Sequence, residues 1–234
     1  MLDCISVKNM RLSDALTIEN FVPSLELMHR AATGVFRAVK WHGRVAIVVG
    51  SGNNGGDGFA LACILHHKNI ECTVLTVSLR LSADSAHYAA KASELGVPIL
   101  PFAPGCLDGF DMVVDCLLGT GFQGALRENY RTAIEEINAS NAQVISVDIN
   151  SGMNGDTGEG ELIARSDLTI TIGFVKHGLV TENAGRYMKR LVCADIGIRL
   201  AKEEYKICTI DEHHPNAIPC PPWLDMAVID VTTD

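Results

Sequence analysis

The sequence predicts an α/β fold, in which a mostly parallel central sheet is covered by helices on both faces. Short apolar runs such as residues 45–49 and 168–172 recur along the chain, and most of them alternate with helical patterns. The runs contain few polar positions, which is typical of strands that helices bury on both sides. A length of 234 residues fits one large domain, and we expect a single domain over residues 1–234.

The elements are expected in the following order. A helix over residues 24–40, with Ser24 as its N-cap, is indicated by apolar residues at spacings of three and four. Helical patterns also cover residues 60–65, 82–95 and 127–140. Strands are expected at 45–49, 73–77, 97–102, 111–118, 144–147 and 168–172, and a further one at 191–192. The Pro-rich segment 215–222 is interpreted as a chain packed over the surface.

Composition excludes several classes of protein. The formal net charge is −9, and no cluster of Lys or Arg offsets it locally, which disfavours nucleic acid and anionic membranes as partners. Eight cysteines occur without any CxxC pair, so we expect reduced thiols and neither a zinc site nor disulfides. The first residues lack an export signal, and no apolar stretch approaches the roughly 18 residues that span a bilayer. We therefore expect a cytoplasmic protein.

A glycine-rich segment follows the first strand and reads GSGNNGGDG over residues 50–58. Its Asn-Gly and Asp-Gly pairs would also suit hairpin turns. The helical pattern that follows favours phosphate binding instead, because glycines let backbone amides approach an anion and a helix N-terminus is partly positive. An ordinary NAD-dependent dehydrogenase is disfavoured, because the second strand ends in TVSLR at 76–80 and lacks the acid that binds the ribose.

Two further polar loops follow predicted strands. Asp115 ends one strand and is followed by a Gly/Thr loop, and Asp148 ends the next and is followed by Asn and Ser. A single acid at such a place commonly serves only as a cap. Three such loops at the carboxyl ends of parallel strands predict one shared pocket, because ligands bind at this edge of the sheet.

Taken together, these segments resemble the YjeF N-terminal domain family, whose enzymes are NAD(P)H-hydrate epimerases. The resemblance rests on GNNGGDG at 52–58, D-x-L-L-G-T-G at 115–121 and V-D-I-x-S-G at 147–152, and extends from Asp14-Ala15 to residues 169–178. It implies a three-layer αβα sandwich related to Rossmann folds and usually homodimeric. It further implies interconversion of the R and S forms of hydrated NADH and NADPH (NADHX and NADPHX), needed because a partner dehydratase accepts only the S form.

The resemblance also implies roles for individual residues. Asp148 would contact the substrate, and the family's potassium ion (K+) would be held by oxygen ligands from Asn54, Asp115 and Ser151, a donor set that suits a hard cation. Two walls of the nucleotide site are implied, formed by Asn53, Asn54, Gly55, Gly56 and Asp57 and by Gly119, Thr120, Gly121, Phe122, Gln123, Gly124 and Ala125.

Epimerisation at C6 of the hydrated nicotinamide ring can proceed by loss of hydroxide and return of water, or by ring opening and reclosure. Both routes require proton transfer at oxygen. Asp148 is our candidate for the acid/base group, because burial and a nearby cation can tune a carboxylate at a strand end. Lys176 is the second catalytic candidate, to hold a phosphate or developing negative charge; the alternative is a solvated or salt-bridged lysine. Asn150 and His177 depart from the family pattern, since proline usually stands at both positions, and local stiffness there is in question.

An alternative function is a non-catalytic YjeF-type module for dimerisation or interaction. Such modules tend to lose the pocket residues, whereas Asn54, Asp115, Asp148 and Ser151 are all present here, which favours the enzyme. Many bacterial relatives carry a fused ADP- or ATP-dependent dehydratase, for which 234 residues leave no room. We therefore expect a separate dehydratase as the pathway partner.

Overall fold

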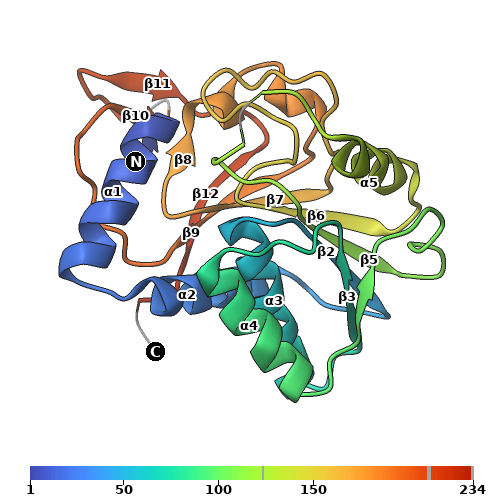
Figure 1. Cartoon of the computed structure of the whole chain (residues 1–234). Helices are drawn as coiled ribbons and strands as arrows, with labels where there is room; N and C mark the ends of the chain where they lie inside the picture. Colours follow the sequence, from blue (N-terminus) through green and yellow to red (C-terminus); the bar gives the residue numbers. More distant parts are fainter. Residues whose placement is uncertain (123, 210–211, 233–234) are drawn as a thin grey trace.

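A large β-sheet forms the centre of the computed structural model, which describes residues 1–122, 124–209 and 212–232 (Figure 1). Its eight strands, in chain order, are β2 (Val45–Val49), β3 (Cys72–Thr76), β4 (Ile99–Pro101), β5 (Met112–Cys116), β6 (Gln143–Val147), β7 (Leu168–Ile172), β9 (Leu191–Asp195) and β12 (Leu224–Asp230). They lie in the order β12-β9-β7-β6-β5-β2-β3-β4, and all neighbours are parallel. The predicted parallel sheet is confirmed.

The direction in which strands are added to the sheet reverses beside β2. From β2 the chain adds β3 and β4 on one side, and then crosses to add β5, β6 and β7 on the other. In open parallel sheets such a switch leaves a crevice at the carboxyl ends of the two central strands, because the connections on either side diverge. The topology therefore places a cavity after β2 and β5, where two of the predicted polar loops begin.

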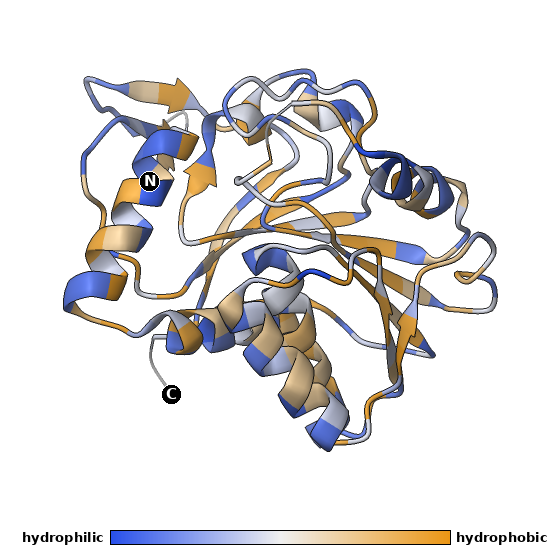
Figure 2. Cartoon of the chain, in the orientation of Figure 1, coloured by the Kyte–Doolittle hydropathy of each residue, from blue (hydrophilic) through white to orange (hydrophobic). Residues whose placement is uncertain are grey.

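Helices cover both faces of the sheet, as predicted. On one face lie α2 (Ser24–Ala38), α3 (Asn53–His67) and α4 (Ala83–Glu94), and on the other lies α5 (Glu128–Ala139) (Figure 1). Figure 2 shows mainly hydrophobic residues along the central strands and mainly hydrophilic ones on the visible side of α5.

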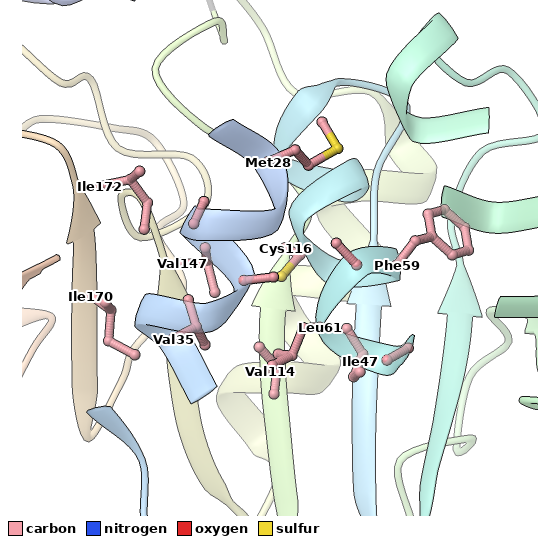
Figure 3. Packing of buried hydrophobic residues seen from close by; sticks show 14 of the residues in the cluster. Met28, Val35, Ile47, Phe59, Leu61, Val114, Cys116, Val147, Ile170 and Ile172 are labelled. Atoms are coloured by element: carbon pink, nitrogen blue, oxygen red, sulfur yellow. The ribbon is translucent and has the colours of Figure 1, made fainter. Parts of the chain in front are cut away.

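The core between these helices and the sheet is continuous. Val35 of α2 and Phe59 of α3 are each 1% exposed and pack in one cluster with Ile47, Val114 and Ile170 of the strands (Figure 3). Burying a side chain of this size stabilises the fold by roughly 1.5–3 kcal/mol relative to exposure. The faces of α2 and α3 are therefore fixed, and with them the ends of these helices that reach the crevice.

The start of α2 differs from the prediction. Ser24 is the first helical residue, not the N-cap, and Pro23 occupies the cap without a side-chain hydrogen bond. The carbonyl oxygen of Pro23 accepts hydrogen bonds from the amides of Glu26 and Leu27, and its fixed φ suits the position before a helix. The helix ends at Ala38, two residues earlier than expected.

The N-terminal residues form elements that the sequence analysis did not predict. They are β1 (Leu2–Ile5) and α1 (Val7–Asn20), which begins after an N-cap at Ser6 whose side chain accepts a hydrogen bond from the amide of Asn9. A second sheet has the order β11-β10-β1-β8, with β8 (Val175–Lys176), β10 (Tyr205–Cys208) and β11 (Ala217–Pro219). Leu2 of β1 pairs with Ile207 of β10, so only the folded chain completes this sheet.

The C-terminal region is more regular than expected. The segment 215–222, interpreted as an irregular surface chain, contains β11, and β12 follows it along the edge of the large sheet. The strand expected at 191–192 is confirmed as β9. Two 3₁₀ helices, His177–Val180 and Ala184–Arg186, complete the chain's regular structure over the described ranges.

Two expectations from composition can be compared with the structure. All eight cysteines are unpaired thiols, as predicted, and six of them are buried. Among the described residues, no helix is long and apolar enough to cross a membrane.

Candidate active site

A cavity of about 500 Å³ lies at the carboxyl ends of the central strands, walled by α1, the first turns of α2 and α3, and the loop after β5. It brings together many of the residues that the sequence assigned to a nucleotide site. The predicted residues that line it are Asn53, Asn54, Asp57, Gly119, Thr120, Gly121, Phe122 and Asp148.

Other predicted residues lie elsewhere. Gly55 and Gly56 are buried within α3 and do not line the cavity. Gly124 lines a neighbouring hollow, and Ala125 is exposed beside it. Gln123 lies outside the described residues. Asp115, Ser151 and Lys176 are buried, and the structure places them beneath the cavity rather than on its surface.

The glycine-rich segment is part of a helix, not a separate loop. Helix α3 begins at Asn53, directly after Gly52, which offers no side chain to cap the first amides. A Cβ atom on Gly55 would lie 2.3 Å from the carbonyl oxygen of Gly50, so glycine is required there by the close approach of α3 to the end of β2. Because Asn53 and Asn54 line the cavity, the partly positive N-terminus of α3 opens into it, as an anion site requires.

A second close approach occurs at Gly119, in the loop after β5. A Cβ atom there would lie 2.8 Å from Oδ2 of Asp148 and 3.2 Å from Cβ of Asn54. The absence of a side chain thus lets the three segments that carry these residues meet.

Both carboxylate oxygens of Asp148 accept hydrogen bonds from the protein. Its Oδ1 accepts a hydrogen bond from Nζ of Lys176 at 2.6 Å, and its Oδ2 accepts one from the amide of Thr120 at 3.0 Å. Its backbone φ is 70°, a left-handed conformation that non-glycine residues adopt at a cost of about 1–3 kcal/mol and that is common at functional sites. The fold therefore directs this carboxylate into the cavity.

Lys176 lies behind this carboxylate and is fully buried. Its Nζ also donates to Oγ1 of Thr171 at 3.0 Å and to the carbonyl oxygen of Ile172 at 2.7 Å. All three ammonium protons are therefore used inside the protein, and none is directed at the cavity.

Asp115 has no exposed surface, and its carboxylate accepts several hydrogen bonds. Oδ1 accepts from Oγ of Ser151 at 2.5 Å, and Oδ2 accepts from the amide of Ser151 and from Oγ of Ser146. Burial nevertheless raises the pKa of Asp115, although these hydrogen bonds act in the opposite direction.

Asn54 is 7% exposed, and neither Oδ1 nor Nδ2 has a hydrogen-bond partner among the described residues. Buried amide groups are usually paired, because leaving one unpaired costs about 1–3 kcal/mol. The amide of Asn54 is therefore a candidate ligand for a bound group. In the described part of the chain, no three His, Cys, Asp or Glu residues form a group that could hold a metal.

Two more carboxyl groups line the cavity with altered proton affinities. Burial raises the pKa of Asp57 well above its usual value, and repulsion from Asp148 and Asp14 adds to the effect while Lys176 opposes it. Burial also raises the pKa of Asp14 to about 6, with Lys176 acting against the shift and Asp148 adding to it. Clustering of such groups in a cavity is typical of active sites.

One wall of this cavity, formed by α1, was not predicted from the sequence. Met10, Arg11, Asp14 and Ile18 line it. Met10, Asp14 and Ile18 are four residues apart in the sequence, and this spacing would have indicated that they share one face of a helix. The helix escaped prediction because its apolar residues do not form a single stripe; Leu12 on another side is 53% exposed.

The two departures from the family pattern are accommodated by polar contacts. The side chain of Asn150 is fully buried, where Nδ2 donates to the carbonyl oxygen of Ala164 at 2.8 Å and Oδ1 accepts from Oγ1 of Thr169 at 2.7 Å. Nε2 of His177 lies 3.1 Å from Oε2 of Glu204. Side-chain interactions thus hold both positions where the family usually has proline.

Comparison with known proteins identifies the family. The family described as YjeF-related protein N-terminus matches residues 24–178, about two thirds of the chain. The chain belongs to this family. The match covers the glycine-rich start of α3, both polar loops and Lys176, but not α1.

Several curated relatives of this YjeF-family chain cover most of its length. The NAD(P)H-hydrate epimerase of Limosilactobacillus fermentum is 36% identical over 199 residues, which are 82% of this chain and 95% of the relative. That of Rhodopirellula baltica is 37% identical over 207 residues, 84% of this chain and 85% of the relative. The Bifunctional NAD(P)H-hydrate repair enzyme Nnr of Coxiella burnetii is 34% identical over 82% of this chain, which corresponds to 41% of that enzyme.

A solved structure has the same fold. The crystal structure of yeast ynu0 superposes with a TM-score of 0.72, covers 90% of this chain and 98% of the yeast chain, and is 20% identical in sequence.

Proposed function

We propose that this YjeF-family chain is an NAD(P)H-hydrate epimerase, an isomerase that interconverts the R and S epimers of hydrated NADH and NADPH. The observation that carries the proposal is the Asp148 carboxylate, held on both oxygens at the wall of a cavity of about 500 Å³. Relatives that bear this name are 36% and 37% identical over more than four fifths of the chain. The cavity falls in the range of small-molecule sites, which extends from about 300 to 1,000 Å³.

Asp148 is the proposed acid/base group at the C6 oxygen of the ring. Nζ of Lys176 at 2.6 Å and the amide of Thr120 hold the carboxylate at the cavity wall, where it can accept a proton from a hydroxyl group or from water. Lys176 acts through Asp148, because its protons are bound inside the protein and do not reach a phosphate. Asp148 is therefore the proposed catalytic residue, and Lys176 the residue that positions it.

The nucleotide part of the substrate is proposed to lie along the start of α3 and the loop after β5. Uncapped amides at the N-terminus of α3 would receive the pyrophosphate. Asn53 and residues 119–122 would line the rest of the site. Gly55 contributes by letting α3 approach the end of β2, and Gly56 by letting α3 pack against Met28 of α2, rather than by contact with the substrate.

Potassium is proposed as the resident cation, held by Asn54, Asp115 and Ser151. The amide oxygen of Asn54, which has no partner within the described part of the chain, and the buried carboxylate of Asp115 fit a hard monovalent cation. Such an ion would supply positive charge under the cavity and fix the start of α3.

The pathway partner is proposed to be a separate dehydratase that consumes the S epimer. The Coxiella burnetii relative is named as a bifunctional repair enzyme, and this chain spans 41% of its length. A homodimer is proposed from the family resemblance, and sedimentation velocity tests it: a single species at the monomer mass would contradict it.

The alternative is a non-catalytic interaction module. One experiment separates the two. A chemically prepared mixture of NADH hydrates is first treated with an S-specific dehydratase until consumption stops, and this protein is then added. An epimerase makes consumption resume until the hydrate is exhausted, whereas a module leaves the remaining R epimer untouched. The Asp148→Asn variant is the matched control and should leave it untouched as well.

A further inference from the structure

The α1 wall of the cavity carries a carboxyl group without a role in the proposed function. Met10, Asp14 and Ile18 follow at intervals of four residues and line the cavity together. Nη2 of Arg11 donates to the carbonyl oxygen of Thr120 at 3.2 Å, and the amide of Thr120 in turn binds Asp148. Helix α1 is thus tied directly to the loop that holds the proposed catalytic carboxylate.

The carboxyl groups of Asp14 and Asp148 differ in their hydrogen-bond partners. Both oxygens of Asp148 accept hydrogen bonds, one of them from an ammonium group. Within the described ranges no hydrogen bond reaches the carboxyl group of Asp14, and burial raises its pKa to about 6. Two carboxyl groups that line one cavity from different environments are a common arrangement of an acid and a base.

Besides Asp14 and Asp148, four charged groups of the described residues lie at or beneath the cavity. Burial raises the pKa of Asp57, on α3, well above its usual value. Lys176 is bound beneath Asp148. Arg11, which is exposed, and Asp84, which is partly buried, also line the cavity. Asp14 is thus the carboxyl group that α1 contributes, on a different wall from Asp57, Asp84 and Asp148.

We propose that Asp14 is the second proton-transfer residue of the epimerisation and acts on the face of the nicotinamide ring opposite to Asp148. This inference rests on the proposed function. With one carboxyl group on each face of the ring, the site can protonate a hydroxyl group that leaves from one face of C6 and deprotonate a water molecule that adds to the other face. The two carboxyl groups come from different walls, α1 and the end of β6.

The C6–O bond breaks, its electron pair stays with oxygen, and that oxygen takes the proton of Asp14 and leaves as water. The lone pair of the ring nitrogen forms the C=N bond of an iminium ion. A water molecule then bonds to C6 from the other face, the C=N pair returns to nitrogen, and the Asp148 carboxylate takes the released proton. Solvent returns the protons to their starting positions, and the reverse reaction exchanges the two roles.

The test uses the full chain and an NADH hydrate enriched in the R epimer, with formation of the S epimer followed by chromatography. Asp14→Asn replaces the carboxyl group by an amide of nearly the same shape that cannot supply the acidic proton, and Asp14→Glu keeps a carboxyl group. Glu19→Gln is the matched control, because Glu19 is an exposed acid on the same helix outside the cavity. If the Asn side chain prevents folding, Asp14→Ala with added formate serves instead, since a small carboxylic acid can fill the space.

We expect Asp14→Asn to lower kcat at least about 100-fold and to abolish the limb of the pH profile near pH 6. Asp14→Glu should keep that limb, formate should raise the turnover of Asp14→Ala, and Glu19→Gln should match the wild type. The inference is overturned if Asp14→Asn keeps the wild-type kcat and pH profile, or if formate has no effect. A wild-type protein without activity would overturn the proposed function as well, whereas active Asp14 variants overturn this inference alone.

Discussion

The buried ion pair beneath the cavity gives the sharpest quantitative prediction. Lys176 has no exposed surface and binds Oδ1 of Asp148 at 2.6 Å, together with two further oxygen acceptors. Lys176→Met fills a similar volume but leaves the Asp148 charge without its partner. Breaking a buried pair from one side costs about 3–5 kcal/mol, so we expect the free energy of unfolding to fall by that amount.

A double-mutant cycle separates the pair from its surroundings. Asp148→Asn leaves the buried ammonium without a counter-ion, and the double variant removes both charges. We expect the double variant to lose about 2 kcal/mol less than the sum of the single variants, measured by urea unfolding at pH 7. Lys189→Met is the control, because Lys189 lies at the same 2.6 Å from Asp167 but its side chain is 80% exposed, and its unfolding midpoint should not change. Additive single variants would refute the coupling.

Four further predictions concern the site. Asp14→Asn should stabilise the protein by about 1–2 kcal/mol near pH 8, because a raised pKa makes the folded carboxylate costly above pH 6, and the gain should fade towards pH 4 in urea titrations. Gly119→Ala should displace Asp148 and lower kcat at least about tenfold in the epimerisation assay, since its Cβ would meet Oδ2 at 2.8 Å; an unchanged kcat contradicts the close approach. Potassium chloride should raise the thermal midpoint more than choline chloride does, and Asn54→Ala should remove that difference. Asn150→Ala should cost about 1–3 kcal/mol in urea unfolding, because buried partners lose their hydrogen bonds, and a smaller loss would mean that water replaces the amide.

The central sheet was predictable because its signal is local. Strands such as β2 and β7 are buried along their whole length, so their apolar runs are visible in the sequence without knowledge of their neighbours. Weaker local signals gave wrong boundaries, as at Ser24, where the cap depends on one residue's backbone conformation. Elements that gain stability only from distant partners were missed, among them β1, which pairs with β10, and α1, whose apolar residues do not share one face.

The sequence by itself determined the fold class, the order of the central strands along the chain, and the acids Asp115 and Asp148 at their carboxyl ends. Only the tertiary structure decided how these groups are paired. It placed Lys176 beneath Asp148, left the amide of Asn54 without a partner among the residues it describes, and brought Asp14 from α1 into the same cavity. The reason is physical: burial and long-range contacts set hydrogen bonding and proton affinity, and neither is written in the residues adjacent along the chain.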